Sequence, residues 1–264
     1  MRAMKLTRRD LEAANERLAA LEPVEILRRV SDAFGPRAAI LSGMQRAGTV
    51  LCHMADRAGL PLEVLFVDTG VLHRETLDLR DELARTHPNL RVTTLHPART
   101  FSEQTREEGL LYLSVDGQAR CCDLRKSEPL RALRGKYDAL VGALRPSEGG
   151  KRASVQVLEL DPEMNALRVH PFASKRPAPW TDDALEACVR ENSGVLVNPL
   201  HAMGFRTIGC FPCTTPVRPD EPERAGRWRH LADVAYCGIN PTDVGAEQEV
   251  DVREHVHTVL SRWT

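Results

Sequence analysis

Short apolar runs alternate with helical patterns along much of the chain. The apolar runs predict buried strands at residues 38–41, 64–67, 91–95 and 139–143. Between them, apolar residues recur every three to four positions, which predicts amphipathic helices at 50–58, 73–85 and 124–134. Strands that alternate with helices are typical of βαβ units, so we expect an α/β fold with a parallel sheet flanked by helices.

Polar turns follow the first two predicted strands. Ser42-Gly43 comes after the first, and Asp68-Thr69-Gly70 comes after the second. Ligands of such sheets bind beyond the carboxyl ends of the strands. We therefore expect these five residues to contact a ligand.

Other patterns flank the sheet. The first 35 residues predict helices interrupted at Pro23. Residues 154–160 and 166–169 predict a hairpin, and Thr181 is a suitable cap for a following helix. Residues 193–226 are rich in Gly, Pro and Arg and have little periodicity, which is typical of a long functional loop.

The chain is long enough for one generous domain. We expect residues 1–240 to form that domain, with the N-terminal helices at 1–35 included. Residues 241–264 are expected to form a C-terminal tail with an amphipathic helix, because Val252, Val256, Val259, Leu260 and Trp263 recur at helical spacing.

Composition excludes several partners. The 264 residues contain 36 Lys+Arg and 37 Asp+Glu, a net charge of −1. General nucleic-acid binding depends on a basic excess, and a membrane span needs about 20 consecutive apolar residues. The chain has neither, and its basic start lacks the apolar core of a secretory signal. We expect a cytoplasmic protein with no nucleic-acid or membrane partner.

Seven cysteines carry the first chemical signal. An odd number in a cytosolic chain favours metal binding or thiol chemistry over a disulfide framework. Cys121-Cys122 and Cys210-Phe211-Pro212-Cys213 form two close pairs, which can hold a [4Fe-4S] cluster or one zinc ion. Adjacent cysteines diverge more than a Cys-x-x-Cys knuckle, which suits the larger cluster. Alternatively, Cys121 and Cys122 are buried small hydrophobes and the other pair is a redox couple.

Basic residues gather beside these cysteines and beside the predicted strand ends. They are Arg125, Lys126, Arg145, Lys151, Arg152, Arg218, Arg224, Arg227 and Arg229. Guanidinium groups match phosphate or sulfate bidentately, so this local excess predicts an anion site. The alternative is a solvated charged face.

Cys237 stands apart from both pairs, in Tyr236-Cys237-Gly238-Ile239-Asn240. A thiol near cations has a lowered pKa and a larger reactive thiolate fraction. Without such cations a lone cysteine fills a core, which is what we expect of Cys52 and Cys188 in their helical stretches.

Several segments resemble motifs of the iron–sulfur-dependent adenylyl-sulfate reductases, part of the phosphoadenylyl-sulfate/adenylyl-sulfate reductase family. The segment 121–130 is similar to Cys-Cys-x-x-Arg-Lys-x-x-Pro-Leu, and 198–214 to the family's second cysteine motif. Glu223-Arg224-Ala225-Gly226-Arg227-Trp228 matches its arginine motif, and Val67-Asp68-Thr69-Gly70 its Leu-Asp-Thr-Gly segment.

The resemblance implies a Rossmann-like sheet of the adenine-nucleotide α-hydrolase type, with a cysteine- and arginine-rich C-terminal segment. It implies reduction of adenosine 5′-phosphosulfate (APS) to sulfite and AMP in sulfate assimilation. Cys237 would attack sulfur, and thioredoxin or glutaredoxin would release sulfite. Cys121, Cys122, Cys210 and Cys213 would hold a [4Fe-4S] cluster. Substrate would contact Ser42, Gly43, Asp68, Thr69, Gly70, Arg125, Lys126, Arg145, Arg152, Arg224 and Arg227. We also expect a homo-oligomer.

The chain differs from the family pattern at three places, which keeps alternatives open. The loop 42–48 aligns only with a gap, Pro146-Ser147-Glu148 replaces the usual Gln-Ser, and Tyr236 and Asn240 replace an acid and a histidine. One alternative is a relative that acts on 3′-phosphoadenosine 5′-phosphosulfate (PAPS) or another adenylylated substrate. Another is a non-catalytic [4Fe-4S] nucleotide sensor. An ATP pyrophosphatase would need a Ser-Gly-Gly-x-Asp-Ser loop, which the sequence lacks.

Replacing the expected nucleophile tests this interpretation. The Cys237→Ser variant should keep the brown colour of an iron–sulfur protein and lose sulfite release, because a hydroxyl cannot replace a thiolate in attack on sulfur. Absorption spectra and a sulfite assay measure the two properties. Turnover at the parent rate would assign the nucleophile elsewhere.

Overall fold

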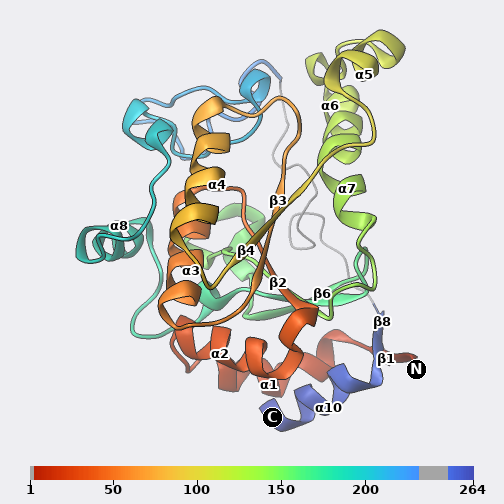
Figure 1. Ribbon diagram of the computed structural model, residues 1–264, viewed down its shortest axis with the longest axis vertical. Helices are drawn as coiled ribbons and strands as arrows, with labels where there is room; N and C mark the ends of the chain where they lie inside the picture. Colours follow the sequence, from red (N-terminus) through yellow and green to blue (C-terminus); the bar gives the residue numbers. More distant parts are fainter. Residues whose placement is uncertain (1–2, 232–248) are drawn as a thin grey trace.

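The computed structural model describes residues 3–231 and 249–264. A six-stranded sheet runs through its centre in the order β4-β3-β2-β5-β7-β6 (Figure 1). The strands are β2 (Ala38–Leu41), β3 (Glu63–Val67), β4 (Arg91–Leu95), β5 (Ala139–Val141), β6 (Leu158–Asp161) and β7 (Ala166–Val169). All neighbours pair in parallel except β6 and β7, which are antiparallel. The predicted α/β fold is confirmed.

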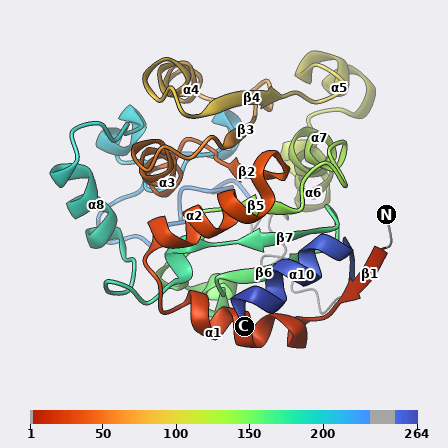
Figure 2. The same cartoon turned by 60° about the horizontal axis from the view of Figure 1, so that its bottom comes forward.

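Helices cover both faces of this sheet. In Figure 2, α2 (Pro23–Phe34), α3 (Arg46–Arg57) and α8 (Asp182–Glu191) lie on one side, and α6 (Val115–Cys122) and α7 (Glu128–Arg131) lie on the other. The remaining helices of the first half are α1 (Glu12–Leu18), α4 (Arg74–Thr86) and α5 (Phe101–Glu108).

Alternate residues of each inner strand enter different hydrophobic cores. On β2, Ala38 and Ile40 belong to the large core under α2 and α3, whereas Ala39 packs in a smaller core on the opposite face. On β3, Val64 likewise packs in the large core, and Leu65 packs in the smaller core. Because both faces are buried, these strands have continuous apolar sequences, which is why the sequence revealed them.

Helix boundaries differ from the prediction at two places. The helix predicted from residue 50 begins at Arg46, since its first turn carries polar and small residues that give no apolar signal. The helix predicted at 124–134 is divided: α6 ends at Cys122, a π turn spans Asp123–Ser127, and α7 follows. π turns disrupt the helical spacing on which the prediction relied.

The chain termini pair with one another, which the sequence did not indicate. β1 (Ala3–Leu6), placed where only helix was predicted, is antiparallel to β8 (Val250–Arg253). Its partner is at the far end of the chain, so no local pattern reports the pairing. α10 (Glu254–Trp263) follows β8 and buries Val256 and Trp263 in the large core. The division proposed at residue 240 stays a prediction.

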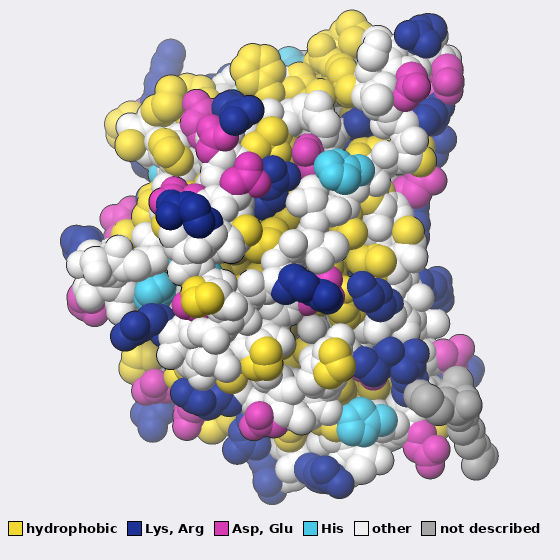
Figure 3. All heavy atoms as spheres, viewed as in Figure 1, with side chains coloured by type: hydrophobic (Ala, Val, Ile, Leu, Met, Phe, Trp, Pro, Cys, Tyr) yellow, Lys and Arg dark blue, Asp and Glu magenta, His cyan; other side chains and the backbone are white. Residues whose placement is uncertain are grey.

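Charges of both signs are interspersed on the face in Figure 3, and hydrophobic side chains gather along its upper edge. Within residues 3–231 and 249–264, no helix combines the length and apolarity that crossing a bilayer requires.

Trp263 should anchor the C-terminal helix to the body of the protein. Trp263 is 6% exposed. The centroid of its ring lies 5.9 Å from that of Phe34 in α2, and the two rings meet edge to face. We expect Trp263→Ala to lower the free energy of unfolding by about 3 kcal/mol, because a buried aromatic leaves a cavity. Urea denaturation measures this loss. The exposed neighbour Arg262, changed to Ala, should cost no more than about 0.5 kcal/mol; equal stabilities would show that α10 does not support the core.

Candidate functional site

A large cavity of about 750 Å³ opens at the carboxyl ends of the inner strands. Ser42 and Gly43 after β2, Thr69 after β3, and Ala143 and Arg145 after β5 line it. This is the edge at which open parallel sheets bind ligands.

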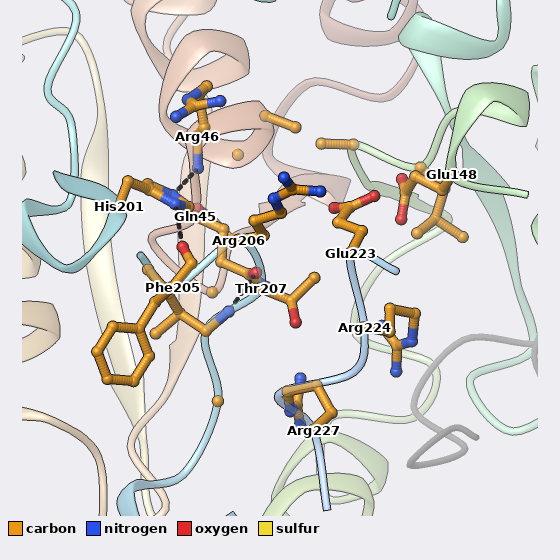
Figure 4. Close-up of a pocket in the computed structure, with 18 of the residues that line it drawn as sticks. Gln45, Arg46, Glu148, His201, Phe205, Arg206, Thr207, Glu223, Arg224 and Arg227 are labelled. Carbon is orange, nitrogen blue, oxygen red and sulfur yellow. Dashed lines mark hydrogen bonds between the residues drawn. The ribbon is translucent and has the colours of Figure 1, made fainter. Parts of the chain in front are cut away.

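The start of α3 is hydrogen-bonded to the loop that carries His201 and Ile208, and both segments line the large cavity. The backbone N–H of Arg46 donates to Nε2 of His201 (3.3 Å), and Nδ1 of His201 donates to the carbonyl of Phe205 (2.7 Å), as Figure 4 shows. These two contacts require the neutral ring, and burial lowers the pKa of His201. The side chain of Gln45 accepts the backbone N–H of Ile208 at 2.8 Å. The helix terminus and the loop therefore form one wall.

Two arginines that follow β5 and line the large cavity are held in place by carboxylates. Arg145, 4% exposed, contacts Asp182 at 2.6 Å, and Arg152 contacts Glu148 at 2.5 Å. Such pairing fixes long cationic side chains before a ligand arrives.

Arg227 is held by an aromatic ring instead. Its Cζ lies 4.4 Å from the ring centroid of Trp228, and its buried Nε has no hydrogen-bond partner within the described ranges. An unpartnered donor that lines a cavity fits an anionic ligand.

Carboxylates also face the large cavity. Glu223 and Glu148 point toward each other in Figure 4, and Asp182 adds a third negative charge to the group. Burial raises the pKa of Glu223, and the other two carboxylates raise it further. The large cavity is therefore cationic overall but contains one acidic region.

A second, smaller cavity is lined by four cysteines. Cys121 and Cys122, the tandem pair at the end of α6, face Cys210 and Cys213 from the loop before the arginine motif. We call it the cysteine cavity. No disulfide joins the cysteines of the described ranges. Lys126 lines both cavities, so the two sites adjoin.

Polar side chains contact the sulfur atoms. Oγ1 of Thr69 lies 3.3 Å from Sγ of Cys210, and the amides of Gln104 and Gln118 donate to the tandem pair. Burial raises the pKa of Cys121, and that of Cys213 to about 11, so these groups become thiolates only with a strong compensating positive charge.

The donor set fits an iron–sulfur cluster in number and type. Four thiols surround one cavity, and Lys126 and Arg125 lie beside it. Among the described residues, no three His, Cys, Asp or Glu side chains converge closely enough to hold a single metal ion.

The structure brings together most of the residues predicted to bind substrate. Those that line the large cavity are Ser42, Gly43, Thr69, Lys126, Arg145, Arg152, Arg224 and Arg227. Asp68 and Gly70 do not line it: Asp68 accepts the N–H of Gly70 at 2.8 Å and shapes the turn. Cys237 lies outside the described residues.

Arg125 is also placed differently from the prediction. It is 2% exposed and does not line the large cavity. Its Nε donates to the carbonyl of Thr69 at 2.5 Å and its Nη1 to Oε1 of Gln104 at 2.9 Å. These contacts make Arg125 a positioning residue for the turn after β3, because its donors are engaged by the protein.

Sequence reasoning missed several residues of the large cavity. Gln45, Arg46, Asp182, His201, Arg206 and Glu223 line it without having been assigned a role. Glu223 had a signal, since it directly precedes Arg224 in the arginine motif. The others lie in segments whose approach to the sheet depends on the tertiary fold.

A family profile and two proteins of known name match most of the chain. The profile of the phosphoadenosine phosphosulfate reductase domain matches residues 38–216. The chain is 36% identical over 229 residues to adenosine 5′-phosphosulfate reductase of Streptomyces coelicolor, covering 87% of this chain and 92% of that protein. It is 35% identical over 224 residues to the protein of the same name in Mycolicibacterium smegmatis, covering 84% and 90%.

A solved structure shares the fold. The crystal structure of phosphoadenylyl-sulfate reductase from Candida auris, in a phosphate complex, superposes with a TM-score of 0.66 at 22% identity. The alignment covers 81% of this chain and all of that one (100%).

Gly209 tests the placement of Arg227. A Cβ at this position would lie 2.5 Å from Nη2 and 2.6 Å from Cζ of Arg227. We expect Gly209→Ala to displace the guanidinium and weaken binding of AMP or sulfate about tenfold, the value of one charge-assisted contact. Calorimetric titration measures the affinity.

The same substitution should leave the thermal midpoint nearly unchanged, because the end of a flexible side chain can move. Arg227→Lys, which keeps the charge and loses the planar fork, provides the companion measurement. Parent-like affinity in Gly209→Ala would show that Arg227 does not contact the anion.

Proposed function

The chain belongs to the phosphoadenosine phosphosulfate reductase family, and we propose that it reduces APS to sulfite and AMP in sulfate assimilation. The observation that carries this proposal is the junction of the two cavities at Lys126. One cavity is large enough for a nucleotide and carries fixed cations, and the other carries four thiols.

The first step is attack by a thiolate on the sulfur of the substrate. By its position after the arginine motif, Cys237 is the proposed nucleophile. A bond forms between its sulfur and the sulfate sulfur, the bond from that sulfur to the bridging oxygen breaks, and AMP leaves with the electron pair. Cys237 is then an S-sulfocysteine.

The second step needs two electrons, which a dithiol protein of the thioredoxin or glutaredoxin class supplies. Its thiolate attacks the Cys237 sulfur, and sulfite leaves with the electron pair. The second thiol of the reductant resolves the mixed disulfide, returning Cys237 as a thiol and the reductant as a disulfide. The cytoplasm, where such dithiols are kept reduced, is the proposed location.

Cations of the large cavity stabilise the charge that grows on the leaving phosphate. Lys126 lines the cysteine cavity, and Arg227 stacks at 4.4 Å on Trp228, which also lines it, so we assign these two cations to the sulfate end of the substrate. Arg145, Arg152 and Arg224 would bind the rest of the anion. Because their carboxylate and aromatic partners hold them in place, they need little reorganisation during the reaction.

Cys121, Cys122, Cys210 and Cys213 would hold the [4Fe-4S] cluster. When bound, it supplies an ordered, polarising group beside the sulfate end of the substrate. Lys126 contributes its positive charge to both cavities, so it would lie between the tandem cysteines and the substrate.

The acidic region supports APS over PAPS. The additional phosphate of PAPS would bring about two more negative charges into a cavity that already holds Glu148, Asp182 and Glu223. Arg145 and Arg152 offset the charges of Asp182 and Glu148, so Glu223 is the carboxylate that we expect to oppose the additional phosphate.

A sulfite-release assay with both nucleotides tests the proposed function. Protein purified without oxygen should release sulfite from APS with thioredoxin, and kcat/KM for PAPS should be lower. Glu223→Gln should narrow this preference about fivefold, because it removes one repulsive charge. The preference should also weaken as the pH falls, since a raised pKa lets Glu223 take up a proton first. If APS yields no sulfite under these conditions, the proposed reaction is refuted.

A further inference from the structure

Two buried glutamines donate hydrogen bonds to the tandem cysteines. Gln104 of α5 is 1% exposed, and its Nε2 lies 3.6 Å from Sγ of Cys121. Gln118 of α6 is 3% exposed, and its Nε2 lies 3.0 Å from Sγ of Cys122. Neither glutamine lines the large cavity, and the proposed reaction gives neither a role.

The amide of Gln104 has only one orientation that satisfies its neighbours. Nη1 of Arg125 lies 2.9 Å from the amide oxygen. A guanidinium is only a donor, so the oxygen must face Arg125 and the NH₂ group must face Cys121. Arg125 is itself fixed by the carbonyl of Thr69 at 2.5 Å. The donor to Cys121 therefore cannot turn away without breaking the hydrogen bond between the amide oxygen and Nη1 of Arg125.

Gln118 is placed by the helix that carries its acceptor. It lies four residues before Cys122 on α6, so the two side chains share one helix face. A buried primary amide without a hydrogen-bond partner is unfavourable, because it loses its bonds to water. A neutral thiol is a weak acceptor, whereas a thiolate sulfur is a strong one. Each glutamine is thus matched to a sulfur that carries negative charge.

We infer that Gln104 and Gln118 are positioning residues for the [4Fe-4S] cluster, donating N–H···S bonds to its two tandem ligands. The inference rests on the proposed function, since it requires that cluster. Hydrogen bonds to cluster sulfurs stabilise the more negative, reduced state and therefore raise the reduction potential. They also stabilise the thiolates against protonation, which slows loss of iron.

The effect is confined to one side of the cluster. In the described part of the chain, Oγ1 of Thr69 lies 3.3 Å from Sγ of Cys210, and neither Cys210 nor Cys213 has a side-chain amide donor. Removing the two amides should therefore loosen the tandem ligands specifically.

Three variants of the full chain, isolated without oxygen, test the inference. Gln104→Leu and Gln118→Leu remove the amide donor and replace the glutamine with an apolar side chain of similar size. Gln118→Glu keeps the shape but places a carboxylate beside the sulfur. Iron and sulfide content, bleaching of the thiolate-to-iron absorption by a chelator, and the reduction potential are measured.

The leucine variants should bleach roughly tenfold faster than the parent, the equivalent of one charge-assisted hydrogen bond, and have a lower reduction potential. Gln118→Glu should bleach faster still. Gln156→Leu is the matched control, since Gln156 is exposed and its amide oxygen accepts from Asn15, so its bleaching should match the parent.

The outcomes separate the inference from the proposed function. A brown, active parent whose Gln104→Leu and Gln118→Leu variants keep the same bleaching rate and potential overturns the inference alone. A parent that is colourless and free of iron overturns the proposed cluster, and the inference with it. If a leucine variant fails to fold, Gln118→Glu decides the inference, because it retains the side-chain volume. Bleaching of Gln118→Glu at the parent rate would then overturn the inference.

Discussion

The arrangement of both cavities depends on one buried guanidinium. Arg125 donates to the carbonyl of Thr69 after β3, to the carbonyl of Arg99 before α5 at 3.3 Å, and to the amide of Gln104 within α5. A buried guanidinium whose N–H groups lack acceptors lowers the stability of the fold. The partners of Arg125 must therefore keep their relative positions. One charged group thereby fixes the turn that lines the large cavity and the helix that contacts the cysteines.

Arg125 lies within the π turn at Asp123–Ser127. It follows directly on the tandem cysteines, and it directs neighbouring side chains to different sites. Arg125 enters the protein interior, whereas Lys126 lines both cavities. A regular helix advances each residue by the same angle, and a π turn changes that angle locally. The π turn thus changes the relative directions of Arg125 and Lys126, two adjacent basic residues that lie at separate sites.

Charge in the large cavity is arranged before any ligand arrives. Arg145 and Arg152 are paired with Asp182 and Glu148, and Arg227 is stacked on Trp228. Preorganised cations stabilise developing negative charge without reorganisation. In the proposed function, the acidic region beside these cations would limit how much negative charge a ligand can bring. A nearly neutral chain thus gathers cations around one cavity.

The sequence alone determined the central sheet and the residue types of the site. Strands buried on both faces have continuous apolar runs, and motifs such as Cys121-Cys122 have fixed local spacing, so both can be recognised without coordinates. Only the tertiary structure decided that β1 pairs with β8, that Arg125 turns away from the large cavity, and that Gln104 faces the sulfur of Cys121. These features join residues distant in sequence or depend on a π turn, and neither leaves a periodic signal along the chain.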